Sequence, residues 1–157
     1  MIKNLKSKLD EVDKRIINIL LEDAQMPYAE VAKRAFVSSG TVHVRLKKLK
    51  GLGVIQGVQL KIDYSRLGYD IKAFLGVYLE KSALYEDVVR QLEEIPEITN
   101  VDYTTGNYAM FVKLLCEDTN HLREVLHEKI QRIEGISRTE TIISLNEDVN
   151  RNIEITE

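Results

Sequence analysis

The amino-acid sequence predicts an α+β protein in two parts, a small helical part followed by a sheet with helices. Apolar residues recur with helical spacing through about residue 50, and from residue 72 onward apolar strand and helix patterns alternate in the order βαββαβ. Charge divides near the same place: residues 1–61 hold 12 Lys/Arg and 6 Asp/Glu, whereas residues 62–157 hold 10 and 19. This asymmetry predicts a basic part for a polyanion and an acidic part with another role.

The overall composition is that of an ordinary globular protein, with 157 residues of which 44% are hydrophobic and 30% are charged. No apolar run approaches the roughly 20 residues of a membrane span, and the first residues lack the apolar core of an export signal. The single cysteine, Cys116, cannot form an internal disulfide, and its apolar neighbours indicate a packed thiol. We therefore expect a cytoplasmic protein without a membrane partner.

The first predicted helix begins after Asp10, which is suited to cap it. Asp13 falls at the third position, where an acidic group favours the positive end of the helix dipole. The inward stripe comprises Val12, Ile16, Ile19 and Leu20. A second, shorter helix over 28–35 carries mostly small inward residues, with Pro27 suited to its first turn. Residues 36–39 then form a tight break.

A third helix is predicted after this break, capped by Ser38 or Ser39. Its inward residues recur at i, i+4 and i+7, and they are Val42, Leu46 and Leu49. Its outer face carries Gly40, Val44, Lys47 and Lys48, flanked by Thr41 and His43. Gly51 and Gly53 are expected to end the helix. The alternation of Val58, Leu60 and Ile62 then predicts a strand, and with it a small β-wing.

A basic, acid-free segment covers this third helix, because no carboxylate lies between Glu30 and Asp63 in a chain of formal net charge -3. Two short helices that meet at a tight break before a cationic helix face are typical of proteins that read the major groove of double-stranded DNA. Phosphates supply the affinity, and the start of the helix reads base edges. The alternative is a solvated helix face. The predicted DNA contacts are Ser38, Ser39, Gly40, Thr41, His43, Val44, Arg45, Lys47 and Lys48.

The second part is predicted to be a ferredoxin-like βαββαβ sandwich. Strands are expected over 72–80, 98–106, 108–117 and 136–145, and helices over 84–95 and 119–133. The two halves echo each other, because Val88, Leu92, Ile95 and Ile98 recur 38 places later as Leu126, Ile130, Ile133 and Ile136. Two helices cover only one face of such a sheet, and the other face carries Phe74 and Tyr78. We expect that face to bind a second copy of the chain, with a solvated face as the alternative.

Catalytic and metal-binding patterns are weak in this sequence. His121 and His127 lie six residues apart on a predicted helix, so they point to different sides, and no nearby cysteine completes a metal set. There is no glycine-rich phosphate loop, and nothing ties a serine or threonine to a histidine base. We expect no catalytic residue, metal or cofactor, and an enzyme is the weaker alternative. An RNA-binding module shares the strand order, but it needs a basic surround, whereas this half is acidic.

The turn "YTTGNYA", residues 103–109, is a predicted hairpin rich in hydroxyl and amide donors. Gly106 permits an unusual backbone angle there. Two interpretations are open, a ligand site or a plain turn, because a Gly-Asn pair satisfies hairpin geometry without any ligand.

The order "LDEVDKRIINIL", "AEVAKR", "VSSGTVHVRLKKLKGLGVIQG" and a βαββαβ module with "TTGNY" resembles the Lrp/AsnC (feast/famine, leucine-responsive) transcription regulators. The resemblance covers about residues 9–155. It implies a winged helix-turn-helix DNA reader over 1–55, a wing strand and hinge over 56–71, and an effector-sensing and oligomerisation domain over 72–157. It further implies homodimers that assemble further, often to octamers, and an amino-acid effector bound near the hairpin between dimers.

The resemblance places the effector contacts on the hairpin residues Thr104, Thr105, Gly106, Asn107 and Tyr108. This chain also departs from the family's pattern. Phe36 stands where the turn often has glycine, and Ser38-Ser39 where Ser-Pro is usual. The run Gly106–Ala109 stands where Gly-Asp-Tyr-Asp is favoured, so both carboxylates are absent. An effector's ammonium group would therefore find fewer anionic partners in this loop.

Overall fold

The structure is a computed structural model that describes residues 8–156. It divides into two compact units. One unit contains the chain up to Lys61 together with the segment from Val149, and the other spans Ile62–Asp148. No helix among the described residues is long and apolar enough to cross a membrane.

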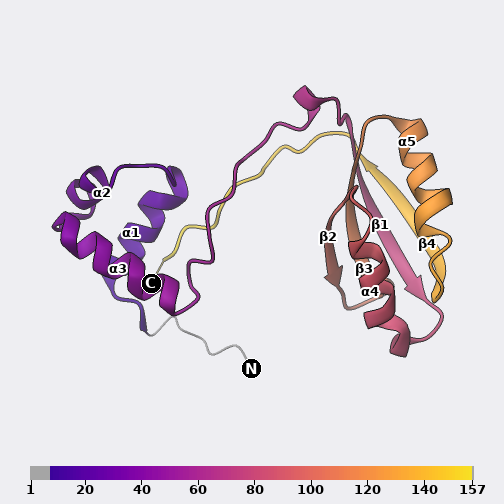
Figure 1. Cartoon of the computed structure of the whole chain (residues 1–157), viewed down its shortest axis with the longest axis horizontal. Coiled ribbons are helices and arrows are strands. Elements are labelled where there is room, and N and C mark those ends of the chain that lie inside the picture. Colours follow the sequence, from indigo (N-terminus) through magenta and orange to yellow (C-terminus); the bar gives the residue numbers. More distant parts are fainter. Residues whose placement is uncertain (1–7, 157) are drawn as a thin grey trace. The chain divides into compact units, whose positions relative to one another are not determined.

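The first unit is built from α1 (Glu11–Glu22), α2 (Tyr28–Ala35) and α3 (Ser39–Gly51), as Figure 1 shows. The expected Asp10 cap is confirmed, and it forms a capping box: Asp10 accepts from the backbone of Asp13, and Asp13 accepts from the backbone of Asp10. The core is apolar side chains from all three helices, namely Ile16, Ile19, Val31, Ala32, Ala35, Val42 and Leu46. The predicted inward faces of the three helices are therefore confirmed.

The predicted wing strand is wrong for the single chain. Residues 55–63 have no regular secondary structure, and Val58 and Leu60 are 67% and 79% exposed. Alternating apolar residues favour a strand only when a neighbouring strand pairs with the backbone. Among the described residues, no strand pairs with residues 55–63, because the four strands of the sheet all lie within Ile71–Ser144.

The second unit is a four-stranded antiparallel sheet with two helices. Its elements are β1 (Ile71–Leu79), α4 (Tyr85–Glu93), β2 (Ile98–Tyr103), β3 (Met110–Cys116), α5 (Thr119–Glu124), the π-helical continuation η4 (Val125–Ile130) and β4 (Ile136–Ser144), with short 3₁₀ turns η2 (Ser65–Leu67) and η3 (Ser82–Leu84). The strand order is β2-β3-β1-β4 (Figure 1). This confirms the ferredoxin-like prediction.

The two faces of this sheet differ as the alternation in β1 predicts. Ala73, Leu75 and Val77 pack with Val88 and Leu92 of α4 and with the α5–η4 helix, all in one core. Cys116 is buried in the same core, and this burial raises the pKa of its thiol to about 11, which confirms the packed thiol. Both helices of this unit pack on that face, and the described residues place no helix on the other one. Phe74 of β1 and Phe111 of β3 stack there, with ring centroids 5.5 Å apart.

The C-terminal segment belongs with the first unit. Asn18 of α1 makes two hydrogen bonds to the backbone of Ile155: its Oδ1 accepts from the Ile155 N–H at 2.9 Å, and its Nδ2 donates to the Ile155 carbonyl at 3.1 Å. The domain boundaries 1–55, 56–71 and 72–157 remain predictions. However, the last of these ranges includes a segment that contacts α1.

Candidate nucleic-acid interface and sensing hairpin

Helix α3 begins at a serine cap and presents one polar face to solvent. The Ser38 hydroxyl oxygen accepts from the Thr41 N–H at 3.1 Å and lies 2.9 Å from the Thr41 hydroxyl. Val42, Leu46 and Leu49 are buried, as expected. The residues left exposed, from the cap to the end of the helix, are Ser38, Ser39, Gly40, His43, Val44, Lys47, Lys50 and Gly51. This exposed set includes six of the nine predicted DNA contacts. One of the six is the cap Ser38, and the other five share the outer side of the helix.

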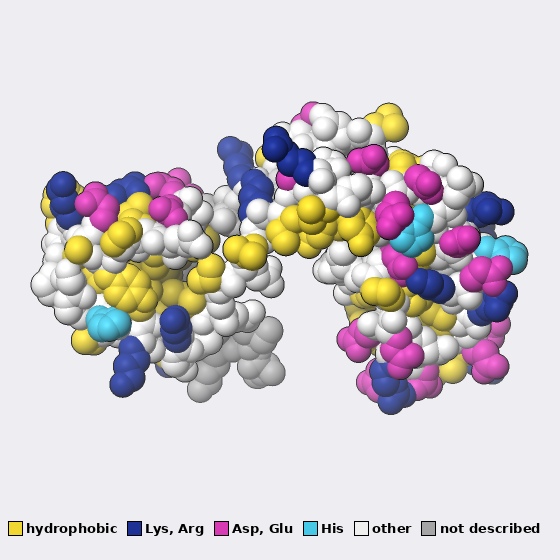
Figure 2. All heavy atoms as spheres, turned by 45° about the horizontal axis from the view of Figure 1, so that its top comes forward, with side chains coloured by type: hydrophobic (Ala, Val, Ile, Leu, Met, Phe, Trp, Pro, Cys, Tyr) yellow, Lys and Arg dark blue, Asp and Glu magenta, His cyan; other side chains and the backbone are white. Residues whose placement is uncertain are grey.

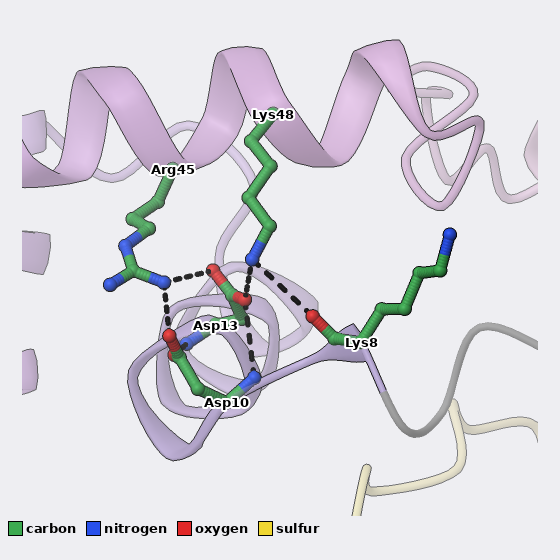
Figure 3. Close-up of polar contacts among 5 residues, drawn as sticks. All are labelled: Lys8, Asp10, Asp13, Arg45 and Lys48. Atoms are coloured by element: carbon green, nitrogen blue, oxygen red, sulfur yellow. Dashed lines mark hydrogen bonds and ion pairs between the residues drawn. The ribbon is translucent and has the colours of Figure 1, made fainter.

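Arg45 and Lys48 point the other way, toward the start of α1, as Figure 3 shows. Lys48 Nζ lies 2.6 Å from Oδ2 of Asp13, and an Arg45 Nη lies 3.2 Å from Oδ1 of the same carboxylate. Arg45 also donates to the carboxylate of Asp10. The sequence placed Lys48 on the outer face of the helix. The structure corrects this, because Asp13 is fully buried and attracts both cations across the unit.

These contacts form a cluster of Asp10, Asp13, Arg45 and Lys48, called the α1–α3 charge cluster below. The backbone hydrogen bond from Asp13, followed by Arg45, holds the pKa of Asp10 below its ordinary value of 3.8. The hydrogen bond to Asp10 raises the pKa of Arg45. The cluster therefore joins the first turn of α1 to the middle of α3.

Tyr28 is a residue of this surface that the sequence alone did not single out. It is the first residue of α2, and its ring centroid lies 5.2 Å from that of His43 in an edge-on arrangement. Its position at the predicted start of a helix could have identified it from the sequence, because helix N-termini bind phosphate groups. Tyr28 thereby brings the start of α2 beside the outer face of α3.

Phe36 adopts a left-handed backbone conformation, with φ 58° and ψ 44°, in the turn between α2 and α3. This is the strain expected for a side chain at a position suited to glycine, and it costs on the order of 1 kcal/mol or more. The side chain is 84% exposed. The next residue, Val37, packs against the core instead.

The hairpin between β2 and β3 separates the predicted effector residues into a tip and a base. Thr105, Gly106 and Asn107 are exposed at the tip, where Gly106 has φ 105°. At the base, the Thr104 hydroxyl donates to the Tyr108 carbonyl at 2.8 Å. The Thr104 hydroxyl is therefore engaged within the hairpin, whereas the side chains of Thr105 and Asn107 and the backbone of Gly106 are exposed at its tip.

Tyr108 lies on the uncovered face of the sheet beside a carboxylate that sequence reasoning missed. Its hydroxyl donates to Glu140 at 2.8 Å, and the Tyr78 hydroxyl donates to the other Glu140 oxygen at 3.1 Å. These bonds, Tyr108 first, hold the pKa of Glu140 below its usual range, and the bond to Glu140 raises the pKa of Tyr108. Arg138 pairs with Glu140 as well. Only the register of β4 against β1 reveals this neighbourhood.

The two units differ in surface charge, as their compositions predict. In Figure 2, acidic side chains are spread over the visible face of the second unit. Within residues 8–156, no group of three or more His, Cys, Asp or Glu side chains could hold a metal ion.

Comparisons with known proteins match both units. The model of the AsnC-type helix-turn-helix domain matches residues 9–50, and that of the Lrp/AsnC ligand binding domain matches residues 72–153. The chain is 42% identical to the regulatory protein AsnC of Haemophilus influenzae over 145 residues, which are 92% of this chain and 97% of that one. It is 38% identical to the transcriptional regulator FL11 of Pyrococcus horikoshii, over 90% of this chain and 92% of that protein.

Solved structures agree with this assignment. The structure of Escherichia coli AsnC superposes with a TM-score of 0.89 at 38% identity, covering 94% of this chain and 99% of that one. A feast or famine regulatory protein from M. tuberculosis, solved with L-methionine, has the same fold at a TM-score of 0.87 and 24% identity, covering 94% and 99% of the two chains. The matched domains, their order and the level of identity make this chain a member of the Lrp/AsnC family of transcriptional regulators.

Proposed function

We propose that the outer face of α3 reads a specific sequence in double-stranded DNA, and that the chain regulates transcription by occupying that sequence. The observation that carries this proposal is the exposed side of a capped helix bearing Gly40, His43, Val44 and Lys47, held in a three-helix unit of helix-turn-helix type. Lysines at the rim bind phosphates, while small and apolar groups near the helix start approach base edges. Such a protein acts in the cytoplasm, where its DNA lies, and as a binding protein rather than an enzyme.

Selection from a library of random DNA duplexes by the full-length chain tests this proposal. The enriched duplex should bind at least about a thousandfold more tightly than a scrambled duplex of the same composition, as sequence-specific proteins do. Equal affinity for the two duplexes at every salt concentration would contradict sequence-specific reading. The enriched duplex is called the selected duplex below.

The second unit is proposed to sense a small molecule, with an amino acid as the first candidate. The family model describes this region as a ligand binding domain, and the M. tuberculosis relative was solved with L-methionine. The hairpin tip of Thr105, Gly106 and Asn107 offers hydroxyl, amide and backbone donors, which suit a carboxylate. The alternative is that this hairpin only joins dimers, and that the concentration of the protein sets regulation.

Calorimetric titration of the full-length chain with each of the twenty amino acids separates these alternatives. Binding of one amino acid that disappears in Gly106→Val would support the pocket, because a branched side chain is strained at φ 105° and blocks the exposed backbone. Light scattering must show the same oligomeric state for the wild type and for Gly106→Val. If none of the twenty amino acids gives a heat of binding, the alternative stands that the hairpin only joins dimers.

The uncovered face of the sheet is proposed to bind a second copy of the chain. Phe74 and Phe111 stack at its centre, and Ile142, which pairs with Phe74 in the register of β1 and β4, is 51% exposed. An apolar centre with a polar rim is the usual anatomy of a dimer interface. Dimers would then assemble further, to an octamer. Light scattering that found a stable monomer at micromolar concentration would contradict this assembly.

The RNA-binding alternative is weaker than dimerisation on this face. Phe74 and Phe111 do lie on the two central strands, as base-stacking aromatics would. However, Phe111 stacks on Phe74 with an interplanar angle of 16°, and Glu140 and Asp102 lie on the same face. Packed rings beside carboxylates suit a protein partner better than a phosphate chain.

A further inference from the structure

Phe36 has a left-handed backbone conformation, which is unfavourable for a phenylalanine. With φ 58° and ψ 44°, it ends α2 in the left-handed region, and its N–H donates to the carbonyl of Lys33 at 3.3 Å. Glycine adopts this conformation without strain, and asparagine does so with little. The backbone of this turn therefore gives no reason for a phenylalanine.

Packing gives no reason either. Ala35 before it is fully buried and Val37 after it packs against the core, so the intervening side chain points outward and is 84% exposed. No ring contact involves Phe36 among the described residues. In the same unit Tyr28 contacts His43, and five further aromatic pairs lie in the second unit. A large apolar ring that strains its backbone and adds little to the core is best explained by something outside the free chain.

The neighbouring sequence indicates which molecule outside the free chain the Phe36 ring contacts. Phe36 comes two residues before Ser38, the cap of α3, so their Cα atoms are at most about 7.6 Å apart. Given the proposed function, the first turn of α3 enters the major groove. The residues that follow, Ser38, Ser39 and Gly40, are small and leave the ring unshielded. The apolar group that base edges present in the major groove is the thymine methyl, a known partner of phenylalanine side chains.

We propose that Phe36 reads a thymine methyl at the edge of the site contacted by the start of α3. This contact adds sequence preference without charge, and it is separate from the phosphate contacts of the lysines. The proposal rests on DNA reading by α3. It adds a residue that lies outside the helix itself.

Replacing single thymines of the selected duplex by uracil tests the proposal, because uracil lacks only the methyl group. For the full-length wild-type chain, uracil at one position near the Phe36 end of the half-site should weaken binding about fourfold, the value of one buried methyl. In Phe36→Gly and Phe36→Asn, the same uracil should have no effect, while affinity for the thymine duplex falls by a similar factor. The dependence of affinity on salt should not change, because no phosphate contact is lost.

Control variants and stability separate this contact from a folding effect. Leu145→Asn removes another apolar side chain, 98% exposed and far along the sequence, and should leave the uracil response intact. Phe36→Gly should melt at a temperature no lower than the wild type, because it relieves the left-handed strain. If the wild-type chain shows no uracil-sensitive position in the selected duplex, the proposal is overturned. It is also overturned if the uracil effect persists in both Phe36 variants. Failure to select any duplex would instead count against DNA reading as such.

Discussion

The ammonium group of Lys48 lies 2.6 Å from a carboxylate oxygen of Asp13, a residue with no exposed surface. Lys48, a cationic side chain of the proposed DNA-reading helix, is thus paired with a carboxylate of the protein itself. Arg45, one turn earlier on α3, approaches the other oxygen of the same carboxylate. The α1–α3 charge cluster therefore has a structural role. The exposed cations of α3 are Lys47 and Lys50, and these are the lysines that we propose bind phosphates.

Asp13→Asn should lower the free energy of unfolding by about 1–3 kcal/mol, because it removes charge-assisted hydrogen bonds from a buried acceptor. Urea denaturation of the full-length chain, followed by circular dichroism, measures this loss. Glu11→Gln is the matched control, since Glu11 is exposed and its ion pair within residues 8–156 is with Lys14, one turn away. That change should cost less than about 0.5 kcal/mol. Equal effects of the two substitutions would contradict a special role for Asp13.

Lys47→Met and Lys48→Met should differ in their salt dependence. Each phosphate contact contributes about 0.9 to the slope of log affinity against log salt. Lys47→Met should reduce the steepness of that slope by about this amount, whereas Lys48→Met should leave it unchanged and lower the stability instead. Fluorescence anisotropy with the selected duplex, repeated over a salt series, gives both slopes. The reverse pattern would place Lys48 on the DNA and Lys47 in a solvated position.

Stability at acidic pH should depend on Asp10. Its pKa is lower in the folded chain than the ordinary 3.8, chiefly through the backbone hydrogen bond from Asp13 and then through Arg45. A depressed folded pKa stabilises the fold above the unfolded value, and this contribution is lost as the pH falls below about 3.8 toward the folded pKa. Asp10→Asn keeps a good cap but cannot titrate. Its unfolding free energy should fall less steeply over this range in parallel denaturation curves, and identical slopes would refute the assignment.

Gly76→Ala should disturb the Tyr108 side of the sheet. A Cβ at Gly76 would lie 2.5 Å from carbons of the Tyr108 ring, so the ring must move and its hydrogen bond to Glu140 is lost. Overpacking of this kind costs about 1–3 kcal/mol. Tyr108→Ala removes the obstacle, so adding Gly76→Ala to that variant should cost much less. Thermal melting of the four proteins of this cycle measures the coupling, and additive losses would show that the ring and Gly76 do not interact.

Local patterns predicted the elements of this protein well. The spacing of Val42, Leu46 and Leu49 identified the buried side of α3, and the alternation in β1 identified both faces of the sheet. Asp10 was recognised as a cap because a capping box lies within three residues of sequence. Each of these features depends on near neighbours, whose geometry is set by the period of the helix or strand.

Contacts between distant residues were beyond such patterns. The sequence predicted that Lys48 faces outward, because nothing in the local pattern relates it to Asp13, 35 residues earlier. Glu140 was missed for the same reason, since it reaches Tyr108 only through the register of β4 with β1. The strand expected at Val58, Leu60 and Ile62 was wrong in the single chain because alternation alone supplies no hydrogen-bonding partner.

Binding of the selected duplex by Lys47→Glu, compared with Lys81→Glu, tests the central claim most directly. Each substitution reverses the charge of one exposed lysine. Lys47 lies on the outer face of α3, and Lys81 lies in the second unit. Fluorescence anisotropy of the two full-length variants, at one fixed salt concentration and with the oligomeric state checked by light scattering, gives the comparison. The account predicts that Lys47→Glu weakens specific binding at least about tenfold, because a phosphate contact becomes a repulsion, while Lys81→Glu stays within about twofold of the wild type. Equal affinity of the two variants would contradict the assignment of this helix face to DNA.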